Sequence, residues 1–196
     1  MSNIAVGPIG WERALMAAEK VKERLRRATK ALDDAGVPYA VAGGNAVAEW
    51  VARVDEEAIR NTRDVDLLVQ RDDFSAVRTA LEGVGFVYYR LLDVDMFIDG
   101  PTGKPSGGVH LLYASEKVKP EYEHVLPDLD ESERAAEFQV TSLEALTRMK
   151  LVSWRDKDRT HLRDMIGVGL IDATWPARFP PSLGARLQQL LDDPNG

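Results

Sequence analysis

The stretch that decides the fold is Asn61-Thr62-Arg63-Asp64-Val65-Asp66-Leu67-Leu68-Val69. Successive side chains of a strand point to opposite faces, so positions 65, 67 and 69 give one wholly apolar face. The opposite face carries Asp64 and Asp66, and residues two apart along a strand have Cα atoms about 6–7 Å apart. A strand this apolar is expected in the centre of a sheet.

Two interpretations of the Asp pair remain open at this point. Carboxylates on a central strand lose hydration and repel each other, unless a divalent cation binds between them. Oxygen ligands favour Mg²⁺ or Mn²⁺ as that cation. In the other interpretation, Asp64 and Asp66 are exposed at the start of the strand and pair with Arg60 or Arg63.

A second feature lies upstream, where the short apolar segment 37–42 is followed by Gly43, Gly44 and Asn45. Glycine lets a backbone approach a ligand closely, and the N-terminus of a helix offers free N–H groups to a phosphate. The pair can also be a tight turn between a strand and a helix. A phosphate cradle followed by a strand with two carboxylates is the layout of metal-assisted phosphoryl transfer, and it predicts that Gly43-Gly44 and Asp64 face one cleft.

Hydrophobic periodicity predicts the remaining elements. Helices are expected over residues 11–34, 45–54, 73–83, 142–155, 158–168 and 183–191, and strands over 37–42, 64–69, 86–92, 94–98 and 109–114. A capping box at Thr141 to Glu144 is expected to begin the helix after the connection. Residues 99–108 read as a flexible loop, and residues 115–137, which are rich in acidic side chains, as a long surface connection.

This order predicts an α/β (α+β) fold with a mixed β-sheet flanked by helices. The chain is expected to divide into a core at residues 1–115 that includes an N-terminal helix, an acidic connecting segment at 116–140, and a C-terminal helical annex at 141–196.

Two motifs carry a resemblance to a known family. Residues 37–44, Val-Pro-Tyr-Ala-Val-Ala-Gly-Gly, and residues 62–68, Thr-Arg-Asp-Val-Asp-Leu-Leu, resemble the signature of the DNA polymerase β-type nucleotidyltransferase superfamily. They are particularly similar to its compact bacterial members, which include AbiEii-type toxins, and the resemblance covers roughly residues 36–114. It implies a nucleotidyltransferase-like core that transfers a nucleotidyl group from a nucleoside triphosphate to a hydroxyl acceptor.

The resemblance also implies roles for individual residues. Gly43, Gly44 and Asn45 would hold the nucleotide phosphates. Asp64 and Asp66 would bind Mg²⁺ or Mn²⁺ and be catalytic.

The chain departs from the family pattern at one position. The family has a third carboxylate on a later strand, and the best match here, Val-His-Leu-Leu at 109–112, has His110 in its place. An imidazole can act as a base near neutral pH or bind a metal, but it does not supply the same negative charge. Asp95 is an alternative third carboxylate, and His110 can also be a packed residue satisfied by Asp66. The sequence therefore leaves an active enzyme and an inactive, nucleotide- or partner-binding protein as competing hypotheses.

A third cluster lies near the C-terminus. On a continuous helix, Lys150, Trp154, Asp158 and His161 fall near one face. Lys150 is the predicted phosphate contact of this cluster. The alternative is an exposed helix held by salt bridges.

Composition excludes several classes of protein. The chain has 196 residues, 25 Lys and Arg against 32 Asp and Glu, a formal net charge of −7 and no cysteine, which excludes disulfides and thiolate metal sites. No apolar run approaches the roughly 18–20 residues that a membrane span needs, and residues 1–10 lack the features of a signal peptide. A cytoplasmic protein without a membrane partner is expected. Its acceptor is open between RNA, protein and a small molecule, and a toxin–antitoxin pair would add an antitoxin partner.

Overall fold

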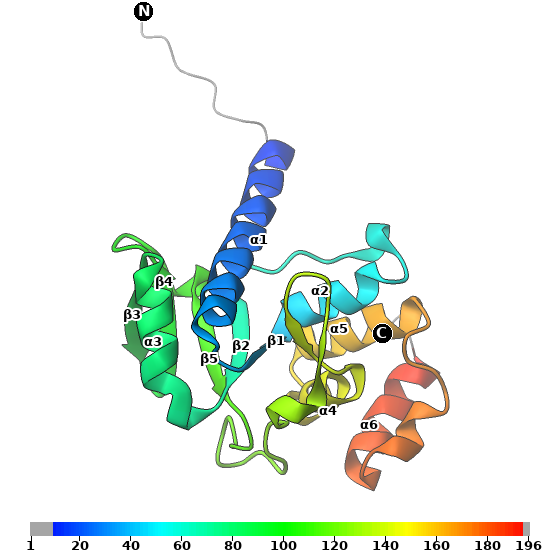
Figure 1. The fold of residues 1–196 in the computed structure, drawn as a ribbon. Helices are drawn as coiled ribbons and strands as arrows, with labels where there is room; N and C mark the ends of the chain where they lie inside the picture. The colour runs from blue at the N-terminus through cyan, green and yellow to red at the C-terminus, as the bar shows by residue number, and fades with distance from the viewer. Residues whose placement is uncertain (1–9, 194–196) are drawn as a thin grey trace, which may run out of the picture.

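The decisive stretch becomes β2 (Val65–Val69), an inner strand of a seven-stranded sheet in the computed structural model, which describes residues 10–193 (Figure 1). The strand order is β3-β4-β5-β2-β1-β7-β6. On one side β2 pairs in parallel with β5 (Val109–Tyr113), and on the other it pairs antiparallel with β1 (Tyr39–Ala42). The predicted mixed sheet is confirmed.

The other elements follow the expected order along the chain. The remaining strands are β3 (Phe86–Leu91), β4 (Val94–Asp99), β6 (Ser132–Arg134) and β7 (Gln139–Thr141). The helices are α1 (Gly10–Ala35), α2 (Gly43–Ala52), α3 (Phe74–Gly83), α4 (Leu143–Ser153), α5 (Asp156–Gly167) and α6 (Pro181–Asp192).

Helices α1 and α3 cover one face of the sheet, and in Figure 1 they lie in front of its strands. The apolar face of β2 is fully buried beneath them, as its alternation predicts. Only the second half of α1 joins this core: Val21, Leu25 and Leu32 are buried, whereas Trp11 and Leu15 are exposed. The apolar side chains of the predicted 11–34 helix are therefore not all buried, because the first turns of α1 project beyond the sheet (Figure 1).

The C-terminal helices pack together and against α2. Helix α4 contacts α2, α5 and α6, and these four helices gather beside the β1 side of the sheet (Figure 1). Leu146, Leu151 and Leu162 are fully buried and belong to the same hydrophobic core as β2. The division of the chain into core, connection and annex stays a prediction.

The acidic connection contains structure that the sequence did not predict. Strands β6 and β7 pair antiparallel, and Val140 of β7 pairs in parallel with Val41 of β1, which extends the sheet by two strands. Strands of three residues are too short for an alternation to be read. The predicted capping box is also wrong: Ser142 caps α4 by accepting from the N–H of Ala145, because the Thr141 hydroxyl donates to the carbonyl of Val41.

Residues 1–9, where the sequence predicts no signal peptide, and residues 194–196 lie outside the described residues. No helix within residues 10–193 combines the length and the apolar character that crossing a bilayer requires.

Candidate functional site

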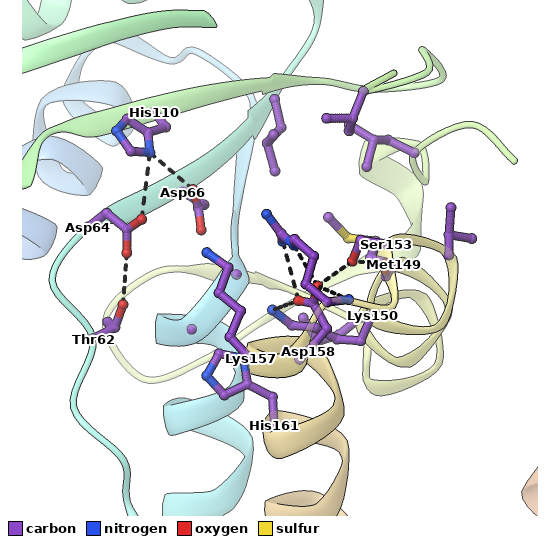
Figure 2. Close-up of a pocket in the computed structure, with 18 of the residues that line it drawn as sticks. Thr62, Asp64, Asp66, His110, Met149, Lys150, Ser153, Lys157, Asp158 and His161 are labelled. Atoms are coloured by element: carbon purple, nitrogen blue, oxygen red, sulfur yellow. Dashed lines mark hydrogen bonds and ion pairs between the residues drawn. The ribbon is translucent and has the colours of Figure 1, made fainter. Parts of the chain in front are cut away.

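Asp64, Asp66 and His110 converge on the face of the sheet that α1 and α3 leave free. The register of β2 and β5 makes Asp66 and His110 direct neighbours, and Asp64 immediately precedes β2. The Nδ1 atom of His110 lies 3.6 Å from an oxygen of Asp66 and 3.7 Å from an oxygen of Asp64 (Figure 2). One ligand atom from each residue falls within 4.8 Å of the others, so the three can hold a single cation.

Two neighbouring side chains fix the position of Asp64. The hydroxyl of Thr62 donates to its carboxylate at 2.9 Å, and the amide of Asn45 donates to its backbone carbonyl at 2.8 Å. The side chain of Asn45 therefore positions Asp64. The predicted contact of Asn45 with phosphate stays a prediction. Thr62 was missed from the sequence, although its place two residues before the first Asp was the available signal.

The loop before β5 orients the imidazole of His110. Its Nε2 lies 3.2 Å from the carbonyl oxygen of Pro105, and a carbonyl only accepts, so Nε2 carries a hydrogen and Nδ1 faces the two carboxylates. The hydrogen bond to Asp66 raises the pKa of His110, and burial opposes it. Burial would raise the pKa of Asp66, but the hydrogen bond and charge of His110 outweigh it, so the pKa of Asp66 is lowered. The pair therefore favours a cationic imidazole beside an ionised carboxylate.

The glycine turn lies directly against these carboxylates. Gly43 has a φ of +65°, and a Cβ atom there would lie 2.7 Å from Cγ of Asp66 and overlap its Oδ2 atom. A Cβ at Gly44 would lie 3.0 Å from the side chain of Thr62. No side chain caps the start of α2 at Ala42, which leaves the N–H groups of its first turn available to an anion. The expectation that Gly43-Gly44 and Asp64 face one cleft agrees with this geometry.

Lys150 occupies a buried ion pair. Its Nζ lies 3.3 Å from Asp158, and the two side chains are 6% and 0% exposed, so the alternative of an exposed, salt-bridged helix is wrong. Burial lowers the pKa of Lys150, and the charge of Asp158 opposes this. Burial opposes ionisation of Asp158, but hydrogen bonds from Arg155 and Ser153 and the charge of Lys150 lower its pKa to about 2. Lys150 is thus neutralised locally, and its predicted contact with phosphate stays a prediction.

The end of helix α4 redirects the chain, and this decides which side chains of the following helix reach the site. Trp154 has a φ of +48° and ends α4, so the predicted common helical face for Lys150 and Asp158 does not exist. Helix α5 starts in a new direction, and Figure 2 shows Lys157 extending from it toward the carboxylate of Asp66. The charge of Lys157 contributes to lowering the pKa of Asp66. Lys157 belongs to the basic cluster of the sequence but was predicted to have no role, because it lies off the face that Lys150 and Asp158 would share on a continuous helix.

Helix α5 also places His161 beside the glycine turn. Burial and the charge of Lys150 lower the pKa of His161 to about 4, which keeps the ring neutral. Its Nδ1 atom is buried and has no hydrogen-bond partner among the described residues.

Asp95 is excluded as a third carboxylate of the site. Met96 pairs with His110 and shares its face, so Asp95 points to the opposite face of the sheet. There it accepts hydrogen bonds from the hydroxyls of Tyr88 at 2.6 Å and Tyr113 at 2.7 Å. Asp95 serves the packing of β3, β4 and β5.

The residues of the candidate site on the free face of the sheet surround one cavity of about 730 Å³. It is lined by six of the seven predicted site residues: Gly43, Gly44, Asp64, Asp66, His110 and Lys150. Thr62, Lys157, Asp158 and His161 line it too. The site therefore combines a candidate cation position, a helix N-terminus and the ammonium of Lys157, which together suit a metal-bound polyphosphate.

Comparison with solved structures identifies the fold. A nucleotidyltransferase-like protein from Paracoccidioides brasiliensis aligns with a TM-score of 0.59 and 20% identity over 90% of this chain and 89% of that one. ANT(2'')-Ia in complex with adenylyl-2''-tobramycin aligns with a TM-score of 0.57 and 19% identity over 87% of this chain and 98% of that one. This chain has the nucleotidyltransferase fold.

A third structure agrees with this assignment. The lincosamide antibiotic adenylyltransferase LnuA, bound to lincomycin, aligns with a TM-score of 0.50 and 14% identity over 70% of this chain and 90% of that one. No protein-family model matches the sequence, and no curated protein sequence matches it. The superfamily resemblance is thus supported at the level of the fold, and the AbiEii-type branch stays a prediction.

Proposed function

We propose that this protein transfers a nucleotidyl group from a nucleoside triphosphate to a hydroxyl acceptor, with Mg²⁺ or Mn²⁺ as cofactor. The observation that carries the proposal is the convergence of Asp64, Asp66 and His110 beside the Gly43-Gly44 turn at the start of α2. A carboxylate pair can bind a cation, and a helix N-terminus can bind a phosphate. Because the two lie side by side here, the cation and the phosphate would bind next to each other.

The proposed chemistry assigns one task to each group. Asp64 and Asp66 would hold the cation, which when bound neutralises phosphate charge and polarises the phosphoryl group. The free N–H groups at Gly43-Gly44 and the ammonium of Lys157 would bind the triphosphate. The acceptor oxygen bonds to the α-phosphorus, the bond from that phosphorus to the bridging oxygen breaks, and pyrophosphate leaves. A cation bound between the carboxylates would disfavour the imidazolium of His110, and Nδ1 of the neutral ring would then take the proton of the acceptor hydroxyl, since Nε2 donates to the carbonyl of Pro105.

The fold neighbours support a small-molecule acceptor over RNA or protein. One of these structures contains adenylylated tobramycin, and another contains lincomycin, so the same fold accommodates small hydroxyl compounds.

A second candidate function is nucleotide binding without transfer. His110 favours it, because an imidazole in place of a third carboxylate leaves the site with less negative charge to hold two cations. An antitoxin partner belongs to the same set of proposals and rests on the AbiEii-type resemblance alone.

Label transfer separates the two candidates. The protein is incubated with Mg²⁺ or Mn²⁺, each of the four α-labelled nucleoside triphosphates, and either total RNA or a small-molecule cell extract. We expect label in an acceptor from wild type and none from Asp64→Asn with Asp66→Asn, while Asp34→Asn, an exposed carboxylate on α1, serves as the matched control. A melting shift with Mg²⁺ and nucleotide but no label transfer supports the binding protein, and absence of both refutes the two proposals.

A further inference from the structure

The free face of the sheet changes from charged to apolar across its strands. Strand register makes Asp66 the neighbour of His110, His110 the neighbour of Met96, and Met96 the neighbour of Tyr89. Side chains paired in this way project from one face. A single row therefore runs across four strands: the carboxylate on β2, the imidazole on β5, the thioether on β4 and the aromatic ring on β3.

A second row beside the first is apolar throughout. Leu112 lies two residues beyond His110 on β5, and Val94 and Leu91 are paired at the end of the β3–β4 hairpin. Together with Met96 and Tyr89 these residues form an apolar shelf. Tyr89, Leu91 and Val94 are exposed, so no described element covers the outer part of the shelf. Exposed, contiguous apolar surface of this kind marks binding sites in folded proteins.

The shelf is continuous with the candidate site. Val94, Met96 and Leu112 line the same cavity as Asp64 and His110. Lys157 reaches the site from α5, whereas His110 comes from β5 (Figure 2). The shelf residues that line the cavity come from β4 and β5. In phosphoryl transfer the attacking oxygen and the leaving group lie roughly in line on opposite sides of phosphorus. Triphosphate bound at Lys157 therefore leaves the His110 side, and with it the shelf, to the acceptor.

Charge restricts what the acceptor can be. The acidic side chains that line the cavity within the described residues are Asp64, Asp66 and Asp158. The first two form the candidate cation position, and Asp158 is already paired with Lys150 and Arg155. The shelf itself carries no charged group, so a polycationic acceptor finds no anionic partner there, whereas an apolar body can be desolvated against it.

We propose that the acceptor is a neutral hydroxyl compound with an apolar body, which packs on the shelf and presents its hydroxyl to His110. This inference rests on the nucleotidyl-transfer function proposed above. It specifies the acceptor class, which that function leaves open.

Probe binding tests the shelf directly. The probes are methyl β-D-glucoside, n-octyl β-D-glucoside below its micelle concentration, and tobramycin, each titrated by calorimetry with Mg²⁺ and a non-transferable α,β-methylene nucleoside triphosphate. The two glucosides share their sugar hydroxyls and differ in the apolar tail. Burying even two methylene groups strengthens binding about tenfold, so we expect the octyl compound to bind at least tenfold more tightly than the methyl compound, and tobramycin not to bind.

A matched pair of variants assigns the preference to the shelf. Val94 and Val87 are 43% and 39% exposed and lie on the same face of the same hairpin, but only Val94 lines the cavity. Val94→Asp is expected to reduce the preference for the octyl compound at least fivefold, and Val87→Asp to leave it unchanged. Because both side chains are exposed in the wild type, both variants are expected to fold.

Several results would overturn the inference: equal affinity for the two glucosides, no binding of the octyl compound, binding of tobramycin in preference to it, or the same preference in Val94→Asp as in wild type. The proposed function fails separately, when the label-transfer assay gives no labelled acceptor from total RNA or cell extract. Label transfer together with loss of the octyl preference would refute the acceptor class alone.

Discussion

Gly43→Ala tests whether the glycine turn and the carboxylates form one unit. The backbone of Gly43 has a φ of +65°, where a side chain costs about 1–2 kcal/mol. The new methyl group would also overlap the carboxylate of Asp66, and overpacking of this kind costs about 1–3 kcal/mol more. The free energy of unfolding should therefore fall by about 2–5 kcal/mol, the sum of these two costs.

Gly36→Ala is the matched control for the backbone. Gly36 ends α1 with the same φ of +65°, but a Cβ atom there meets nothing within 4 Å. It should cost only the backbone strain of about 1–2 kcal/mol. The difference between the two variants isolates the contact with Asp66.

The assay is urea unfolding with and without Mg²⁺ and nucleoside triphosphate. A ligand at one hundred times its dissociation constant stabilises the folded protein by about 2.7 kcal/mol, and this gain should survive in Gly36→Ala. It should be lost in Gly43→Ala, because the displaced Asp66 no longer faces the cation position. If Gly43→Ala is no less stable than Gly36→Ala and keeps the ligand-dependent gain, the reasoning about the turn is refuted.

Substitutions at three further positions separate structural from chemical roles. Asp158→Asn should lower stability at neutral pH by about 3–5 kcal/mol, since it leaves a buried lysine without its counter-charge. The wild-type carboxylate has a pKa of about 2 when folded, below its ordinary value of 3.8, so its contribution is complete above about pH 4 and is lost as the pH falls toward 2; acid unfolding of the variant should be flatter in that window. Asp95→Asn should cost about 1.5–3 kcal/mol in urea unfolding, because Tyr88 and Tyr113 lose a charged acceptor, but label transfer per folded molecule should not change. His110→Ala should abolish label transfer while the nucleotide-dependent melting shift persists, and His110→Asp should restore transfer; full activity in His110→Ala would make His110 a packing residue.

Local pattern was sufficient to predict the centre of the fold. The alternation in residues 61–69 predicts a strand, and the adjacent glycines at 43–44 predict a tight turn. Both predictions depend only on local backbone conformation, and the folded chain has both features. The sequence could not show which face Asp95 occupies relative to His110. That depends on the pairing of Met96 with His110, a contact between strands that no local pattern encodes.

The positions of the basic residues Lys150 and Lys157 were predicted wrongly for a different reason. A helical wheel that continues past Trp154 assigns Lys150 and Asp158 to one helix and gives Lys157 no role. A non-glycine residue gives no sequence signal for a left-handed conformation. The backbone of Trp154 is left-handed, and this changes the direction of the chain there. As a result Lys150 and Asp158 meet as a buried pair between two helices, and Lys157 becomes the cation that extends toward the carboxylates.

The loop before β5 shows how a segment without regular pattern can define a site. Composition suggests that residues 99–108 are flexible, yet Pro105–Gly107 form a turn of 3₁₀ helix whose first carbonyl accepts from His110 Nε2. That bond decides the tautomer, and the tautomer decides that the lone pair of Nδ1 faces the carboxylates once the ring is neutral. A histidine without the Pro105 contact would be free to present either nitrogen. The loop therefore orients the imidazole at position 110 so that its Nδ1 atom faces Asp64 and Asp66.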